Sequence, residues 1–274
     1  MPARFDPQAL PGMIDLLANL LPGNLRQHMA GLDLRVRTLL ADNRITPIVA
    51  PEYGGEPLSE WLKDFLGAGV LGRGQITVLD LSLVPSDVLT TIVSVLGRLV
   101  FETAQRHRRA TGATLPTVLV LEEAHNFVQR QSQDAEESAP GVRCRQIFEK
   151  IAKEGRKFGV GLVLSSQRPA ELAPTVVAQC NSFLLHRIVN DRDQELVSKL
   201  APDSTGSLLR ELPSLPTQEA ILMGIAAEIP LVFDVQQLPL SQRPSSAHPD
   251  FWAVWTQSRH LDLDLDTLAT KWSD

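Results

Sequence analysis

The stretch TVLVLEEAHNFVQR, from Thr117 to Arg130, is the part of the sequence that decides the fold. An apolar run, Val118 to Leu121, is followed directly by the adjacent acids Glu122 and Glu123. A short run of branched apolar residues predicts a buried β-strand. Ligands of parallel sheets bind beyond the carboxyl ends of the strands, so both carboxylates are expected to lie at such a site.

Strand and helix patterns alternate around this stretch. Further strands are expected at QITVLDLS (75–82), GVGLVLSSQ (159–167) and SFLLHRIV (182–189). Helices are expected over 85–109, which begins with Pro85 and Ser86, and around 144–155. Such alternation predicts an α/β fold with a largely parallel sheet and helices on both faces. The neighbouring runs TQEAILMG (217–224) and IPLVFDVQQL (229–238) predict a C-terminal β-hairpin.

The chain divides into three parts by composition. Residues 1–73 form a helical segment interrupted by proline and glycine, residues 74–240 carry the core pattern, and residues 241–274 are a Pro/Ser linker and tail. The apolar runs in the sequence are strand-sized and no signal-peptide pattern opens it, so we expect a cytoplasmic protein without a membrane partner. The net charge of −6 argues against a protein that coats nucleic acid by charge alone.

An apolar strand that ends in acids has the form of a Walker B element. One of the two carboxylates would help to hold Mg²⁺ through its water shell, and its neighbour would orient or deprotonate a water molecule. The alternative is structural: two solvated glutamates at the start of a helix are stabilised by its dipole without any chemistry.

The motifs that follow occur in a fixed order. After LEEAHNFVQR come EGRKFGVGLVLSSQRP, CNSFLLHRIVNDRDQE and LPSLPTQEAILMG. From about Ile76 to Pro239, this pattern resembles the HerA-like branch of the FtsK/HerA motor ATPases. The resemblance implies a RecA-like P-loop NTPase core, ATP and Mg²⁺ as cofactors, and a hexameric ring around duplex DNA, with a nuclease as a further partner.

The resemblance also implies roles for individual residues. Glu122 takes the magnesium-associated position and Glu123 that of the catalytic glutamate. Gln167 would sense the γ-phosphate or position water, and Arg156 would be an arginine finger that acts on the nucleotide of a neighbouring subunit. Arg156 is expected near the active edge of the sheet, after Gly155 ends the preceding helix.

These residues also have structural interpretations. Gln167 could bond a turn, and Arg156 could stabilise a helix end through the dipole. Arg168 and Arg187 are secondary candidates for phosphate or interface contacts. His125 is interpreted as a packing or hydrogen-bonding residue, and the cluster from Arg106 to Arg109 as a solvated helix end, with DNA contact as the alternative.

One family motif is absent from the sequence. A P-loop requires G-x-x-x-x-G-K-[ST], and none of the 17 glycines is followed by lysine. We therefore expect the chain to correspond to the C-terminal half of such an ATPase, with the N-terminal part of the fold missing. Three functions remain open: part of an ATP-driven DNA translocase or helicase, a non-catalytic interaction module, or a coupling ATPase of conjugation or secretion.

Overall fold

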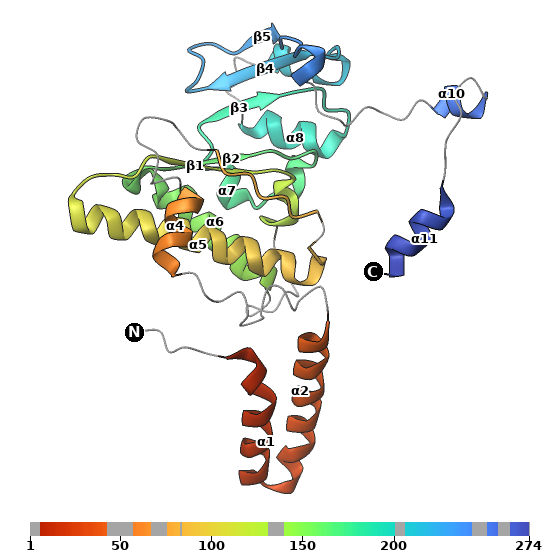
Figure 1. Ribbon diagram of the computed structural model, residues 1–274. Coiled ribbons are helices and arrows are strands. Elements are labelled where there is room, and N and C mark those ends of the chain that lie inside the picture. The colour runs from red at the N-terminus through yellow and green to blue at the C-terminus, as the bar shows by residue number, and fades with distance from the viewer. Residues whose placement is uncertain are drawn as a thin grey trace.

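The structure is a computed structural model of the 274-residue chain. It describes residues 6–42, 57–66, 76–82, 84–130, 140–200, 206–242, 251–256 and 264–273. Figure 1 shows an α/β body in the centre, a helical pair that extends away from it, and two short helices to one side.

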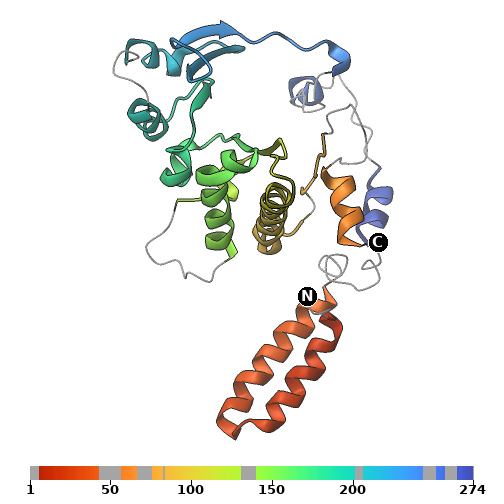
Figure 2. The ribbon, with the colours of Figure 1, turned by 90° about the vertical axis from the view of Figure 1, so that its left-hand side faces the viewer.

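The helical pair comprises α1 (Leu10–Leu20), preceded by the 3-10 turn η1 (Pro7–Ala9), and α2 (Gly23–Ala41). The two helices lie side by side in Figures 1 and 2. Arg37 of α2 reaches Asp33 at 2.6 Å and Asp15 of α1 at 3.0 Å, which ties the helices together at their surface. A third helix, α4 (Leu58–Leu66), follows in the chain.

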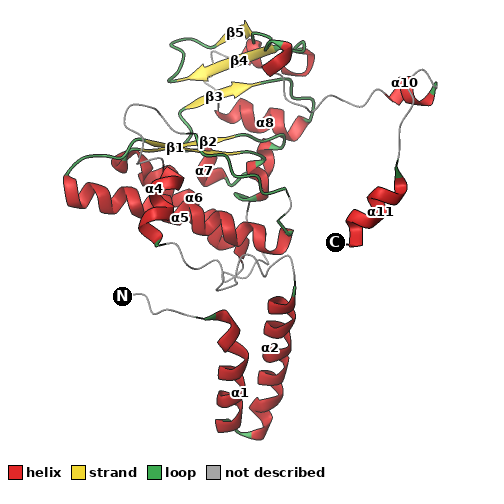
Figure 3. Ribbon diagram, in the orientation of Figure 1, coloured by secondary structure: helices red, strands yellow, loops and turns green. Residues whose placement is uncertain are grey.

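The first half of the α/β body places two parallel strands on two long helices. Its elements are α5 (Ser86–Thr111), β1 (Thr117–Leu121), η3 (Ala124–Asn126), α6 (Pro140–Glu154), η4 (Gly155–Phe158) and β2 (Val160–Leu164). Strands β1 and β2 pair in parallel, with Thr117 opposite Val160 and Leu121 opposite Leu164. The two predicted helices and the strands predicted at 117–121 and 159–167 are therefore present, and Figure 3 shows them together.

The turn that leads into β2 requires a glycine at position 159. Gly159 has φ +85°, a left-handed conformation that side chains rarely adopt, and a Cβ there would lie 2.9 Å from the carbonyl oxygen of Leu115. The turn places the end of η4 next to the start of β1. There the Thr117 amide donates to the Gly159 carbonyl at 3.0 Å.

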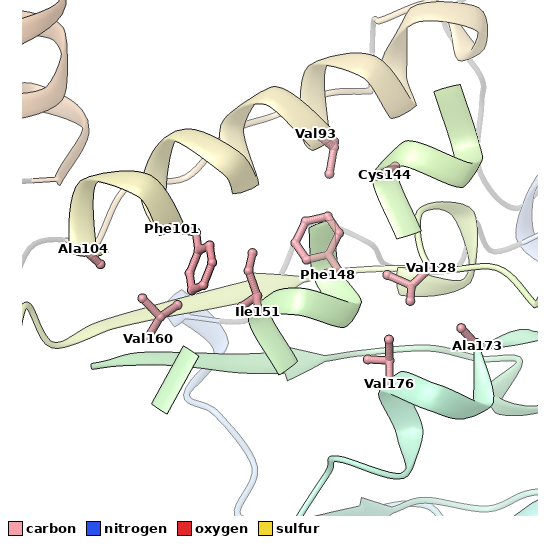
Figure 4. Packing of buried hydrophobic residues seen from close by; sticks show 10 residues of the cluster. All are labelled: Val93, Phe101, Ala104, Val128, Cys144, Phe148, Ile151, Val160, Ala173 and Val176. Atoms are coloured by element: carbon pink, nitrogen blue, oxygen red, sulfur yellow. The ribbon is translucent and has the colours of Figure 1, made fainter. Parts of the chain in front are cut away.

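The main core lies between α5, α6 and one face of the strands. Figure 4 shows Phe101 of α5 close to Phe148 and Ile151 of α6, and the ring of Phe148 reaches Gly97 of α5. These three side chains are at most 2% exposed. Helix α5 is long and apolar enough to cross a membrane by length and composition, and in the structure its apolar face packs along α6.

The second half of the body is an antiparallel sheet with short helices. Its elements are η5 (Pro169–Glu171), α7 (Pro174–Val177), β3 (Ser182–Leu185), α8 (Asp191–Leu200), α9 (Gly206–Leu209), η7 (Leu212–Ser214), β4 (Glu219–Gly224) and β5 (Leu231–Asp234). The sheet order is β3-β4-β5, and the expected hairpin β4-β5 is confirmed. The 3-10 turn η8 (Leu240–Gln242) and helices α10 (Phe251–Trp255) and α11 (Leu265–Ser273) follow.

The structure corrects three expectations about the sheet. The segment Ile76–Ser82 contains no strand, because it forms no β-ladder with another described segment. Strand β3 joins the antiparallel sheet through β4, and its predicted place in the parallel sheet is wrong. The described helices cover one face of β1 and β2, whereas Val118, Val120 and Val163 on the opposite face are 64%, 61% and 48% exposed.

Candidate functional site

The candidate site lies at the carboxyl ends of β1 and β2. Because the strands are parallel and Leu121 is opposite Leu164, the residues that follow them emerge at the same edge. These are Glu122 and Glu123 after β1, and the sequence Ser165-Ser166-Gln167 after β2. Two backbone hydrogen bonds continue the pairing past the strands, from the Ser165 amide to the Leu121 carbonyl at 2.9 Å and from the Ala124 amide to the Ser165 carbonyl at 2.8 Å.

Glu123 is at the centre of a polar network. Gln167 Nε2 donates to Glu123 Oε1 at 2.5 Å. His125 Nδ1 lies 3.3 Å from Glu123 Oε2 and 3.1 Å from Ser166 Oγ. Glu123 Oε2 is itself shielded from solvent and accepts no hydrogen bond in the part of the chain that the structure describes. One carboxylate oxygen is therefore held by an amide, and the other remains available as an acceptor.

The backbone of Glu123 is strained. It has φ 46° and ψ 48°, the left-handed region that costs an ordinary residue about 1–2 kcal/mol. The next residue, Ala124, is completely buried and begins η3, so the turn is anchored in the core. This conformation directs the Glu123 carboxylate toward Gln167, and strain of this kind is typical of functional positions.

Glu122 has a different environment from its neighbour. It is exposed, and Ser165 Oγ lies 3.5 Å from its Oε2. The structure thus separates the two adjacent acids into one solvent-facing carboxylate beside a hydroxyl and one carboxylate that the network holds.

The loop after β2 is fixed by a buried acid that the sequence analysis did not select. Asp193 of α8 is 6% exposed, and its Oδ1 accepts from the Ala170 amide at 2.8 Å. Ser165 and Ser166 were also not selected, although polar residues directly after an apolar strand are the same signal that identified Glu122 and Glu123. Nothing in the local sequence marks Asp193, because its partner is 23 residues away.

The expected place of Arg156 at the active edge of the sheet is wrong. Arg156 lies in η4, directly before β2 begins at Val160, whereas Glu123 and Gln167 follow the ends of the strands. Five strand residues at about 3.3 Å each separate the two edges by roughly 17 Å. The reason is topological: α6 runs back along the sheet, so the residues at its end are delivered to the amino ends of the parallel strands.

The remaining candidates occupy separate positions. Arg168 follows Gln167 and pairs with Glu171 at 3.2 Å. Arg187 is exposed after β3 and takes part in no ion pair with the described residues. His125 is half-buried and bonded to Ser166, in agreement with its interpretation as a hydrogen-bonding residue.

The residues at this edge fit one side of a nucleotide-hydrolysis centre. Carboxylate and hydroxyl oxygens are ligands that Mg²⁺ accepts together with water, and Glu122 with Ser165 provides both. The described residues contain no cluster of three or more metal-ligating side chains. They also offer no free cation beside Glu123 for phosphates, since Arg168 is paired with Glu171. The phosphate side of such a centre is not provided by these residues.

Fold and site define an α/β protein with an acidic site at the carboxyl end of a parallel strand pair. Comparison with known sequences confirms the resemblance to HerA-type helicases. A probable helicase of Methanocaldococcus jannaschii is 40% identical over 122 residues, which is 44% of this chain and 22% of the relative. The DNA double-strand break repair helicase HerA of Pyrococcus furiosus is 38% identical over 42% of this chain and 19% of its own length.

A longer match is to the DNA double-strand break repair helicase HerA of Sulfolobus acidocaldarius, 27% identical over 69% of this chain and 37% of the relative. The chain therefore spans less than half the length of these curated relatives. No family model matches it.

Comparison with solved structures finds the DNA-packaging ATPase B204 from Sulfolobus Turreted Icosahedral Virus. It is 15% identical, with a TM-score of 0.43, over 73% of this chain and 92% of that one. A second solved structure is the genome packaging NTPase B204 from Sulfolobus turreted icosahedral virus 2 in complex with ATP-gammaS. It is 17% identical, with a TM-score of 0.37, over 50% of this chain and 60% of that one.

Proposed function

We propose that this chain provides the water-activating part of an ATP-driven DNA translocase or helicase of the HerA type, with a RecA-like core that assembles as a hexameric ring around duplex DNA. The observation that carries the proposal is the pair Glu123–Gln167 at the carboxyl end of β1 and β2, joined at 2.5 Å. The sequence similarity to HerA helicases supports the assignment to an ATP-driven DNA translocase or helicase.

The chemistry proposed for the chain's own residues is limited to water. The Glu123 side chain is 40% exposed and its Oε2 accepts no hydrogen bond from the described residues, so this carboxylate can take a proton or a hydrogen bond from a water molecule. Gln167 holds the other oxygen and fixes the orientation of the carboxylate. Glu122 and Ser165 would hold Mg²⁺ through its water shell, and the metal would neutralise charge on the phosphates.

Arg156 is proposed as an arginine finger that acts on a neighbouring subunit. Its position about 17 Å from the Glu123 edge prevents action within its own subunit and is compatible with action across a subunit boundary.

The test is Glu123→Gln in the complete protein, including whatever segment supplies a phosphate-binding loop. Glutamine keeps the shape of the side chain and removes the base, so ATP turnover should fall by orders of magnitude while nucleotide binding persists. Unchanged turnover would refute the assignment of Glu123. Glu122→Gln is the companion variant, and it should weaken magnesium-dependent nucleotide binding instead.

A second candidate is a non-catalytic interaction module that retains the fold. The absence of G-x-x-x-x-G-K-[ST] from the sequence favours it. Nucleotide titration of the complete protein decides between the two functions, because the module would bind no Mg·ATP at any concentration that saturates an active motor.

A further inference from the structure

A polar cleft adjoins the candidate site on the side of α8. Its volume is about 1070 Å³, and it lies between the loop after β1, the loop after β2 with η5, and one face of α8. Four cationic side chains line it: Arg130, Arg168, Arg192 and Lys199. Three acids, Glu171, Asp193 and Glu195, also line it, so the lining has a slight excess of positive charge in a chain whose net charge is −6.

The charges in the cleft are only partly compensated. Arg168 pairs with Glu171 at 3.2 Å, and Lys199 pairs with Glu195 at 2.7 Å. The third acid, Asp193, is 6% exposed and already accepts the Ala170 amide.

Two arginines of the cleft have no counterion among the residues that the structure describes. Arg130 and Arg192 are exposed and form no ion pair with any other described residue. They stand on different elements, the loop after β1 and the first turn of α8. The cleft therefore presents two guanidinium groups that no described acid compensates, together with the side-chain amides of Gln129 and Asn190.

Two of the cationic side chains, Arg192 and Lys199, lie on the same face of α8. Arg192, Glu195, Leu196 and Lys199 all face the cleft, and this spacing of three and four residues is one face of the helix. From Arg192 to Lys199, seven residues at about 1.5 Å each give a length of roughly 10 Å. Each strand of duplex DNA carries one phosphate per about 3.4 Å of axis, so roughly three phosphates of one strand pass over that length.

We propose that this cleft is the contact site for the phosphodiester backbone of DNA, with Arg130 and Arg192 as its principal ligands. The inference rests on the proposed function, and it identifies the surface that would bind DNA. A linear polyanion matches cations that are spread over two elements. A mononucleotide concentrates its charge over a few ångströms and requires donors that converge on one point.

The cleft is directly connected to Glu123. Arg168 lines the cleft, and its neighbour Gln167 donates to Glu123. A phosphate that competes with Glu171 for the Arg168 guanidinium would move Arg168. Its neighbour Gln167 is the residue that holds the Glu123 carboxylate. Occupancy of the cleft can therefore be transmitted to the site through a single peptide unit.

The test is binding of a short fluorescein-labelled duplex to the full chain, followed by fluorescence anisotropy from about 50 to 200 mM salt without nucleotide. In Arg130→Ala/Arg192→Ala, affinity at about 100 mM salt should fall roughly five- to tenfold per arginine, and the slope of log K against log salt should fall by about 2. The matched control is Arg108→Ala/Arg109→Ala, two exposed arginines at the end of α5 outside the cleft, with an expected change below about twofold. Arg130→Lys/Arg192→Lys should retain most of the affinity, because phosphates accept either cation.

The proposal would be overturned if the unchanged chain showed no measurable binding, if the α5 control lost as much affinity as the cleft variant, or if the cleft variant kept full affinity. Displacement of the duplex by polyglutamate of equal charge would also overturn it, because the cleft would then select an acidic protein partner. The measurement contains no nucleotide, so its outcome is separate from the turnover test of Glu123.

Discussion

The left-handed backbone of Glu123 leads to a prediction about stability with a defined sign. The comparison is between Glu123→Ala and Glu123→Gly in urea unfolding of the full chain. Both variants lose the contact with Gln167, which is worth about 0.5–1 kcal/mol after allowance for a side chain that is 40% exposed. Alanine retains the Cβ that makes φ 46° unfavourable, whereas glycine adopts this conformation freely.

The expected difference follows from the cost of the left-handed region. Glu123→Gly should be more stable than Glu123→Ala by about 1 kcal/mol, or roughly 2–4 °C in Tm, and close in stability to the unchanged chain. Glu122 supplies the control, since its φ is not positive. There the order should reverse, with the glycine variant less stable than the alanine variant by about 0.5–1 kcal/mol.

Equal stability of the two Glu123 variants, or the same order at both positions, would refute the strained turn. If the prediction is confirmed, glutamate at position 123 lowers the stability of the fold relative to glycine. A role of the Glu123 side chain, and not a requirement of the backbone, would then explain why glutamate occupies this position.

Four further predictions concern the site and the rest of the fold. Gly224→Ala should destabilise the chain by about 2 kcal/mol or more in urea unfolding, because Gly224 has φ +96° and a Cβ would overlap the carbonyl of Asn181; a loss below about 0.5 kcal/mol would contradict this geometry. Burial raises the pKa of the Cys144 thiol to about 12, which disfavours the reactive thiolate, so iodoacetamide at neutral pH should modify it far more slowly in the folded than in the unfolded chain, as measured by mass spectrometry. Calorimetric titration of this chain with Mg·ATP should show very weak binding, and tight binding would contradict the absence of a phosphate-binding side from the described site. In the complete ring, Arg156→Ala should nearly abolish ATP hydrolysis, by roughly 10³–10⁵-fold, and mixing it with Glu123→Gln subunits should restore partial activity; co-assembled mixtures without activity would exclude a finger that acts in trans.

Part of the fold could be predicted from local pattern alone. Strands β1 and β2, helices α5 and α6 and the hairpin β4-β5 all coincide with the expected runs. Periodicity and turn signals act within a few residues, and the chain obeys them in these segments. The neighbourhood of Glu123 and Gln167 was also predictable, because both follow apolar runs and parallel strands end at one edge.

Only the tertiary structure decided which strands pair and where the remaining residues lie. The short apolar run of β3 fits either sheet, and its antiparallel pairing with β4 depends on hydrogen bonds between distant segments. The run Ile76–Ser82 has strand character and acquires no ladder, because a strand requires a partner as well as a pattern. Arg156 was assigned to the wrong edge because a motif fixes residue order, whereas the direction in which α6 returns along the sheet fixes position in space.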